Sequence, residues 1–340
     1  MMGQKTTPVV EPAELPRTIS SDGPRSLPYC AYPKASDVAQ RGVQPLPASL
    51  PLVDLVRAQP HRSRRYSTVV TADLAPAQLL QMARVVASSF ARNEPQTRHL
   101  RLLKYPPMGL MEARHSDPLG SGVPFGPWNM ETLMYWFIRL YLLTDPTSPQ
   151  GDIRVNEEVL TQSLAILDER GQVIAGGFRE TMPSLDASPE FRQDDPFLAA
   201  VFAVLEPVSA LLGTQDAEAL TALSERYSSF REAYTQGNVG HNFLLARSEA
   251  LAKEDAFELV AASAERCRAL GYEYMVTEAT HQWTGAAFEA LGGVRVHFAP
   301  FRAEPTVRKS AEPLEGVVTS PDGFVSDKDS GSMFYVIRLA

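Results

Sequence analysis

The chain has 340 residues, of which 44% are hydrophobic, and a formal net charge of −8 at pH 7. This length and apolar content allow one large domain, or a domain and a half, with a sizeable core. The negative charge argues against a nucleic-acid partner, because such binding draws most of its affinity from concentrated Lys and Arg. The short basic run HRSRR (61–65) is interpreted as a solvated linker.

The only two cysteines, Cys30 and Cys267, lie in unrelated parts of the chain, which argues against a disulfide framework and a cysteine-based zinc site. The first residues have no apolar core like that of a signal peptide. The most apolar runs, 133–143 and 197–212, are too short to span a bilayer or contain a proline. We therefore expect a cytoplasmic protein with no membrane partner.

Prolines recur through the first 60 residues, which favours an extended arm over a long helix. We expect this arm at 1–60 and a single domain at 61–340. The domain opens with a β-branched strand at 66–70. A helix follows, and its apolar face contains Leu79, Met82, Ala83, Val86 and Phe90.

The middle of the chain predicts a buried helix near 129–143, because it is apolar on more than one side. Two apolar runs flanking a polar turn within 163–178 predict a β-hairpin. Two helices should then form an insertion at 195–237. Asp195 would cap the first helix, which we expect to bend or end near Pro207, and the second should end near Gly237.

The last third alternates strands and helices. The expected helices span 249–270 and 283–291, and a polar loop spans 303–332. The expected strands span 242–246, 272–279, 294–298 and 333–340. This order predicts an α/β protein with a mixed sheet and helices packed on its faces.

Three features occur in the order seen in the GCN5-related N-acetyltransferase (GNAT) superfamily, whose members transfer an acyl group from coenzyme A to an amine. LGYEYMVTEATHQWTGAAFEALGGVRV (270–296) resembles the late strand–helix–strand unit, with His281 at an Asn-like position and a closing Leu291-Gly292 pair. SSFARNEPQTRHL (88–100) resembles the end of the first helix in arylalkylamine-type members, and the paired inserted helices resemble that subgroup too. The resemblance implies a GNAT-like mixed β-sheet flanked by helices, with a helical insertion after the hairpin.

The resemblance also implies catalytic residues. An amine must lose a proton before it attacks a thioester, and Glu94 matches the glutamate proposed as general base in that subgroup; the alternative is an exposed helix-end carboxylate. Many members carry a tyrosine acid where this chain has Phe288, which has no proton to donate. His241 and His281 are then the candidate acids, although a histidine at a strand or helix edge is more often a structural hydrogen-bonding residue.

The family's pyrophosphate loop falls at 250–255. Its glycines bring bare N–H groups of a helix start to the phosphates, whereas this chain has Ala250, Leu251, Ala252 and Lys253, followed by two acids. Those acids would repel phosphates but suit a helix start capped by Ser248. The implied coenzyme A contacts are Leu245, Arg247, Ala250, Leu251, Ala252, Lys253 and Phe288.

Two functions follow from these expectations. The first is a GNAT-type N-acyltransferase that moves an acetyl or acyl group from acetyl-CoA or another acyl-CoA to a small amine. The alternative is a degenerate GNAT fold that has lost coenzyme A binding and acts as an interaction module or binds another ligand. A more remote possibility is changed chemistry, such as decarboxylation or hydrolysis, with His241 or His281.

Overall fold

A computed structural model describes residues 42–53, 66–93, 157–182, 196–300 and 331–339, together with positions 131, 134, 135, 137 and 138. At 93, 196–207 and 253–255 it describes the backbone alone. Within these parts of the chain, no helix is both long enough and apolar enough to cross a membrane.

One eight-stranded sheet organises the structure, in the order β1-β7-β8-β6-β5-β4-β3-β2. Every neighbouring pair is antiparallel except β5 and β6, so the sheet is mixed, as predicted. The predicted hairpin is confirmed as the β3–β4 pair. The strands are β1 (Gly42–Val43), β2 (Tyr66–Val70), β3 (Leu164–Asp168), β4 (Val173–Met182), β5 (Val239–Arg247), β6 (Tyr274–Ala279), β7 (Val294–Pro300) and β8 (Gly331–Arg338).

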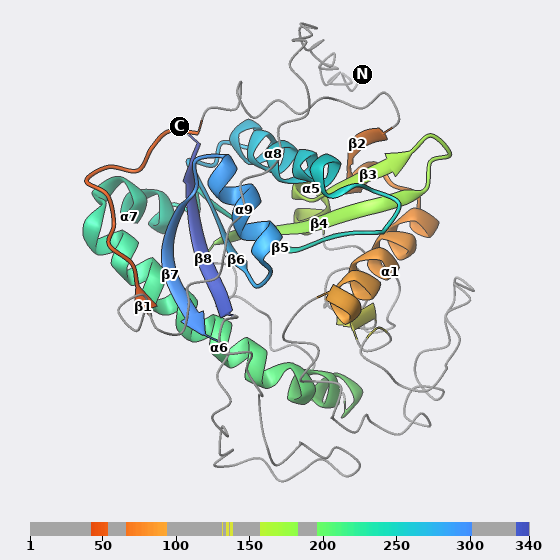
Figure 1. The fold of residues 1–340 in the computed structure, drawn as a ribbon, viewed down its shortest axis with the longest axis horizontal. Helices are drawn as coiled ribbons and strands as arrows, with labels where there is room; N and C mark the ends of the chain where they lie inside the picture. The colour runs from red at the N-terminus through yellow and green to blue at the C-terminus, as the bar shows by residue number, and fades with distance from the viewer. Residues whose placement is uncertain are drawn as a thin grey trace, which may run out of the picture.

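Helices cover both faces of this sheet (Figure 1). The described helices are the 3-10 turn η2 (Thr71–Asp73), α1 (Pro76–Asn93), α5 (Glu157–Gln162), α6 (Pro196–Arg226), α7 (Ser228–Thr235), α8 (Lys253–Ala269) and α9 (Gln282–Ala290). Apolar side chains of α1, α6 and α7 pack on one face, against residues such as Phe178, Val239 and Val276. Those of α8 and α9 pack on the other, against residues such as Met275 and Tyr335. The strands in the middle of the sheet are therefore buried on both sides.

The helical insertion differs from the expectation. Helix α6 continues through Pro207 to Arg226, and the break falls at Tyr227, before α7. The first helix was expected to bend or end near Pro207, and of these two expectations the end is wrong. A proline inside a helix costs a hydrogen bond, but the turns beyond it bury Val208, Ala219 and Leu223, and this packing favours continuing the helix.

The described part of the predicted N-terminal arm lies along the edge of the sheet. Strand β1 pairs with β7, and Val53 donates its N–H to the carbonyl of Arg338 at 2.9 Å. Leu50 and Val53 are buried, and the Tyr227 hydroxyl donates to the Pro47 carbonyl at 2.6 Å. Residues 42–53 therefore belong to the packed body.

Arg179 holds α8 against the sheet. Its side chain lies on β4, fully buried, and donates to the Gln162 carbonyl at 2.7 Å and to the Ser263 hydroxyl on α8 at 2.5 Å. Burial lowers the pKa of this guanidinium, because the charged form loses its hydration. The bond to Ser263 ties the middle of α8 to β4, and the bond to Gln162 ties α5 to the same strand.

Helix α9 ends in a tight backbone cap. Leu291 is the C-cap residue, Gly292 follows with a φ of 86°, and the Gly293 N–H donates to the Phe288 carbonyl at 2.8 Å. This left-handed glycine cap satisfies the last carbonyls of the helix. A Cβ added at Gly293 would lie 2.7 Å from that carbonyl oxygen, so the backbone leaves no room for a side chain.

We predict that Gly293→Ala lowers the free energy of unfolding by about 1–3 kcal/mol, the usual cost of forced overpacking. Gly213→Ala is the matched control. Gly213 lies inside α6 with nothing within 4 Å of an added Cβ, so alanine should stabilise the protein by about 0.5–1 kcal/mol. Urea unfolding of both variants measures the difference, and a neutral Gly293→Ala would contradict this account of the cap.

Candidate functional site

The parallel strands β5 and β6 pair over only three residues each. Val239–His241 pair with Tyr274–Val276, although β5 continues to Arg247 and β6 to Ala279. Figure 1 shows the two strands diverging beyond this pairing. We call the diverging segments, 242–247 and 277–279, the β5–β6 wedge. At its start, the Thr277 hydroxyl donates to the Asn242 carbonyl at 2.6 Å.

A β-bulge lies in the β5 side of the wedge. The register with β4 shifts between Gly176 and Phe178, where β5 has one residue more than its partner. Leu244 has a φ of 51°, and it is the only non-glycine residue with a positive φ in the described parts of the chain. This conformation is unfavourable for a leucine, so the surrounding structure must hold it in place. The bulge changes the direction of the β5 backbone close to the point where β5 separates from β6.

A buried ionic cluster lies at the apex of the wedge, on the face that α6 covers. His241 on β5 contacts Glu180 on β4 through Nδ1 at 3.0 Å and Glu278 on β6 through Nε2 at 2.7 Å. The ring stacks on Phe243 with centroids 5.4 Å apart. Three neighbouring strands therefore each contribute one charged side chain, and the His241–Glu278 contact bridges the two diverging strands.

The two carboxylates determine the charge of His241. Burial alone would lower the pKa of its imidazole, but Glu278 and Glu180 outweigh burial and raise it well above the usual value. For Glu278, burial is the largest single influence and acts to raise the pKa, but the charge and hydrogen bond of His241, together with hydrogen bonds from Asp216 and the backbone, lower it overall. His241 is therefore an imidazolium held between two carboxylates at neutral pH.

A third acid reaches this cluster from α6. Asp216 is buried, and its pKa is raised to about 9, first by burial and then by the negative charge of Glu278. Asp216 Oδ1 and Glu278 Oε1 have no donor among the described residues, as expected of two facing acceptors. A proton on Asp216 turns this pair into a hydrogen bond, so the cluster holds an extra proton at neutral pH.

The segment after β5 is a compact turn and differs from the expected helix start. Helix α8 begins at Lys253, with Ala252 as its N-cap residue, and no side chain caps it. The expectations of a helix from 249 and of a Ser248 cap are therefore wrong. The Ser248 N–H instead donates to the Ile174 carbonyl at 2.7 Å, which extends the strand ladder past β5.

Within this turn the charged side chains have local partners. Arg247 donates to the Leu251 carbonyl and, at 3.2 Å, to the Ser248 carbonyl. Leu251 is fully buried in an apolar cluster under α8, whereas Ala250 and Ala252 are exposed. Glu249 is exposed and lies 3.6 Å from Arg92 in the last turn of α1. The carboxylate that would repel a phosphate thus has a cation beside it.

The other predicted residues have different surroundings. His281 is the N-cap of α9, and its Nδ1 accepts from the Trp283 N–H at 3.1 Å, so the ring proton of the neutral form is on Nε2. Phe288 is fully buried and packs 6.1 Å from the ring of Tyr335. Leu245 contacts the apolar clusters on both sides of the wedge, as does Trp283.

Two predicted residues lie partly or wholly outside the described residues. Glu94 follows directly after Asn93, where the description of α1 ends. The side chain of Lys253 is not described, although its backbone opens α8. The Arg92–Glu249 contact nevertheless brings the end of α1 beside the turn that follows β5.

The sequence analysis missed the partners of His241: Glu180, Glu278 and Asp216. The sequence does contain a signal for two of them, Glu180 and Glu278. Both glutamates interrupt apolar strand patterns, VIAGGFRETM and YMVTEA, and an acid inside a buried strand needs a partner. Despite these acids, the described residues contain no group of three or more His, Cys, Asp or Glu side chains arranged to hold a metal ion.

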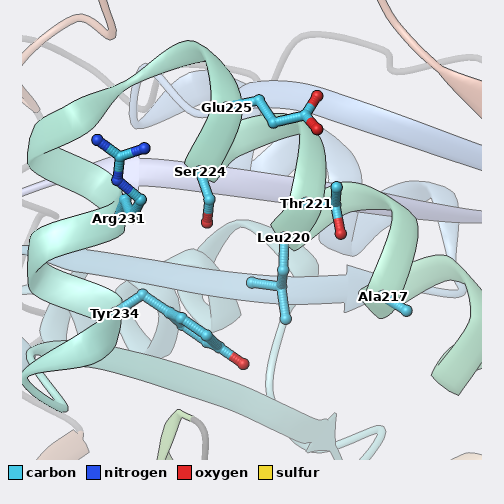
Figure 2. A pocket seen from close by; sticks show the side chains of 7 residues that line it. All are labelled: Ala217, Leu220, Thr221, Ser224, Glu225, Arg231 and Tyr234. Carbon is cyan, nitrogen blue, oxygen red and sulfur yellow. The ribbon is translucent and has the colours of Figure 1, made fainter.

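A surface pocket of about 370 Å³ lies elsewhere, between α6 and α7 (Figure 2). Its walls include Leu220, Glu225, Arg231 and Tyr234, and most of its lining residues are exposed. It contains none of the predicted site residues, so we assign the candidate site to the wedge and its ionic cluster.

The cluster predicts a pH dependence of stability. The unfolded chain releases the protons of Asp216 and His241 near pH 3.8 and 6.5, whereas the folded chain keeps them to higher pH. Stability should therefore fall as pH rises from 6.5 towards 9, each proton contributing at most about 1.4 kcal/mol per pH unit. Asp216→Asn, which keeps a donor towards Glu278, should make this slope shallower.

Urea unfolding between pH 6.5 and 8.5 measures the slope. Glu225→Gln, on the exposed side of the same helix, is the matched control and should leave the slope unchanged. An equal slope in the wild type and in Asp216→Asn would show that Asp216 is ionised in the folded state.

No protein-family model matches the chain, and no curated protein matches it either. Solved structures with a similar fold include an agmatine N-acetyltransferase variant (14% identity, TM-score 0.45, covering 81% of this chain and 100% of that one). Another is arylalkylamine N-acetyltransferase 2 from Aedes aegypti, with 12% identity and a TM-score of 0.44 over 81% of this chain and 99% of that one. A third is the C-terminal condensation domain of Ebony, with 11% identity and a TM-score of 0.45 over 81% of this chain and 99% of that one. At such identities and TM-scores the likeness assigns neither an activity nor a superfamily to this chain. The described residues form a mixed sheet covered by helices on both faces, which is the α/β arrangement that the sequence predicts.

Proposed function

We propose that the chain is a GNAT-type N-acyltransferase that transfers an acetyl or acyl group from acyl-CoA to a small amine. In this reaction the neutral amine nitrogen attacks the thioester carbonyl, a C–N bond forms and the C–S bond breaks. A base takes one proton from the amine, and the departing coenzyme A thiolate takes a proton from an acid.

The observation that carries this proposal is the divergence of β5 and β6 directly beyond a buried ionic cluster. Among the described strands, none pairs with the backbone of β5 past His241 on the β6 side. An acyl-CoA lying along this edge of β5 would supply hydrogen-bond partners for them, much as an added strand does. Its thioester would then reach the apex, beside the charged side chains of three strands.

We assign the general base to Glu94, which directly follows the last described residue of α1 and matches the glutamate of the Asn-Glu-Pro segment noted in the sequence. A carboxylate near an apolar strand edge would have its pKa raised towards neutral pH by burial, as a base for this reaction needs.

We assign the acid to His281, with His241 in a supporting role. The Nδ1 of His281 accepts a backbone hydrogen bond, so its Nε2–H is the donor, and the residue directly follows β6 and Thr280 on the far side of the wedge. His241 is charged, but both of its nitrogens already contact carboxylates. It therefore fits a fixed positive charge at the apex better than a proton donor to the thiolate.

For the coenzyme A phosphates we propose the first turn of α8. The first N–H groups of a helix have no intrahelical partners, and here Ala252 offers no side chain to accept from them. The exposed Ala250 and Ala252 leave this turn accessible. Arg247, however, is occupied by backbone carbonyls of the same turn, so the helix start must supply most of the binding.

The arrangement of Arg247, Leu245 and Trp283 favours a second candidate function, a GNAT-like fold that no longer binds coenzyme A. Arg247 points its donors at its own turn, and Leu245 and Trp283 each pack against both apolar clusters under α8 and α9. Such a protein would act as an interaction module or bind another ligand at the ionic cluster.

We predict that acetyl-CoA binding distinguishes these two functions. A ligand at about a hundred times its dissociation constant stabilises a fold by about 2.7 kcal/mol, which appears as a higher melting temperature. Thermal unfolding with acetyl-CoA and longer acyl-CoAs measures the shift, with ATP as a polyanion control. No shift at millimolar acyl-CoA would contradict the acyltransferase function and favour the second candidate.

We further predict that Glu94→Gln lowers kcat by about 10²–10⁴-fold, the usual contribution of a positioned base, without lowering the melting temperature. Glu157→Gln, at the exposed start of α5, is the control. Turnover is measured as acyl-CoA-dependent thiol release with primary amines. Unchanged turnover in Glu94→Gln would remove this residue from the mechanism.

A further inference from the structure

Two apolar side chains bridge the two halves of the structure on the face of the sheet that α8 and α9 cover. One apolar cluster on this face joins β3, β4 and α8, and another joins β6, β8, α8 and α9. Leu245 on β5 and Trp283 in the first turn of α9 each pack against both clusters. Because α9 begins directly after β6, Trp283 reaches across the open end of the β5–β6 wedge.

This open end lies at the surface of the molecule. Leu245, Ser248 and Trp283 are half-buried, and Glu249 and Ala250 beside them are exposed. We call the three half-buried residues the wedge mouth. Leu245 lies over β4, where a Cβ added at Gly177 would overlap its side chain. The indole of Trp283 is therefore the large side chain that closes the mouth from the β6 side.

The mouth holds two polar atoms that lack partners. Trp283 Nε1 and Ser248 Oγ are buried atoms with no hydrogen-bond partner among the described residues. A buried indole N–H usually has a partner, and leaving such a group unpaired is costly. Ser248 directly follows β5 and Trp283 belongs to the first turn after β6, so each side of the mouth contributes one of these atoms.

The backbone at both residues is held in place. The Trp283 N–H donates to His281 Nδ1 at 3.1 Å, and the next N–H, of Thr284, donates to the His281 carbonyl at 3.0 Å. The Ser248 N–H donates to the Ile174 carbonyl at 2.7 Å. The two side chains can therefore change rotamer without moving the strands or α9.

We propose that Trp283 gates the wedge mouth and binds the pantetheine arm of coenzyme A. The indole closes the mouth in this conformation, turns to admit the arm, and then donates its Nε1–H to an amide carbonyl of the arm. This inference rests on the proposed function, because it requires coenzyme A to lie in the wedge.

The chemistry of the mouth suits an amide. The indole N–H only donates, and the serine hydroxyl both donates and accepts. An amide has one carbonyl acceptor and one N–H donor, so it provides a partner for both atoms, and the arm contains two amides. A phosphate could also accept from the indole, but it would lie close to the carboxylate of Glu249, which follows Ser248. The mouth therefore suits the neutral arm better than the phosphates.

Calorimetry on the full-length protein tests the contact with coenzyme A and with adenosine 3′-phosphate 5′-diphosphate, its nucleotide portion without the arm. Trp283→Phe keeps an apolar ring and removes the N–H. It should weaken coenzyme A binding about 3–10-fold, the usual contribution of one hydrogen bond, and leave nucleotide binding unchanged. Tyr234→Phe, which removes the polar group of an aromatic side chain between α6 and α7, is the matched control and should bind both ligands as the wild type does.

Fluorescence of the wild type follows the gate directly. The chain has three tryptophans, so the difference between the wild type and Trp283→Phe isolates the emission of Trp283. Coenzyme A should shift this emission, because the indole leaves its apolar packing, whereas the nucleotide portion alone should not. Equal coenzyme A affinity of the wild type and Trp283→Phe, or an emission that coenzyme A leaves unchanged, would overturn the proposal and indicate that Trp283 is a fixed part of the core.

Turnover separates this contact from an effect on His281, two residues earlier. A bond to the arm is made equally in the ground state and in the transition state. Trp283→Phe should therefore raise KM for acetyl-CoA about 3–10-fold and leave kcat unchanged. A lower kcat with an unchanged KM would contradict the gate and show that the substitution acts through His281.

These measurements distinguish failure of the gate from failure of the proposed function. A wild type that does not bind coenzyme A contradicts the acyltransferase function and, with it, the gate. A wild type that binds coenzyme A and acetylates amines, with Trp283→Phe equal to it in affinity and KM, retains the acyltransferase function and contradicts the gate alone.

Discussion

The short parallel pairing of β5 and β6 is the constraint on which the rest of the structure depends. Three residue pairs hold the two halves of the sheet together, and beyond them the strands take different directions. Each half continues as an antiparallel ladder, β2 to β5 on one side and β6 to β8 and β1 on the other. The join is reinforced by side chains: Thr277 bonds the Asn242 carbonyl, and His241 bonds Glu278 across the divergence. The apex thus joins the two halves of the sheet and also holds a buried cluster of charged side chains.

Much of this architecture was predictable from the sequence because the signals are local. The pattern of apolar residues predicted α1 and the β3–β4 hairpin, and the glycines that follow α8 and α9 predicted where these helices end. The start of α8 was not predictable in the same way. Ser248 has the chemistry of a cap, but its N–H continues the β4 ladder and Leu251 is drawn into the apolar cluster under α8, so tertiary packing moves the helix start to Lys253. Pro207 is a similar case, because its local preference to end a helix is outweighed by burial further along α6.

The candidate site was predictable only in part, for a related reason. The sequence indicated His241 as a candidate acid at the edge of a predicted strand, whereas its surroundings depend on Glu180, Glu278 and Asp216, which lie 61, 37 and 25 positions away. Sequence spacing does not reveal such partners, because they meet through strand order and through the path of α6. Leu244 is another example: no residue preference indicates its left-handed conformation, which follows from the mismatch between β4 and β5. In this fold the features of the candidate site depend on how the strands pair rather than on the preferences of single residues.

The short strand β1 has a consequence for how the molecule behaves among its neighbours. An outer strand with unpaired backbone groups is a template on which other chains can add. Here residues 42–53 lie along β7 and the end of β8, with two paired residues and several bonds from the following turn. Within the described residues this strand has only two paired positions, so it offers little ladder of its own for another chain to extend. Part of the extended arm expected from the sequence therefore covers the outer edge of β7.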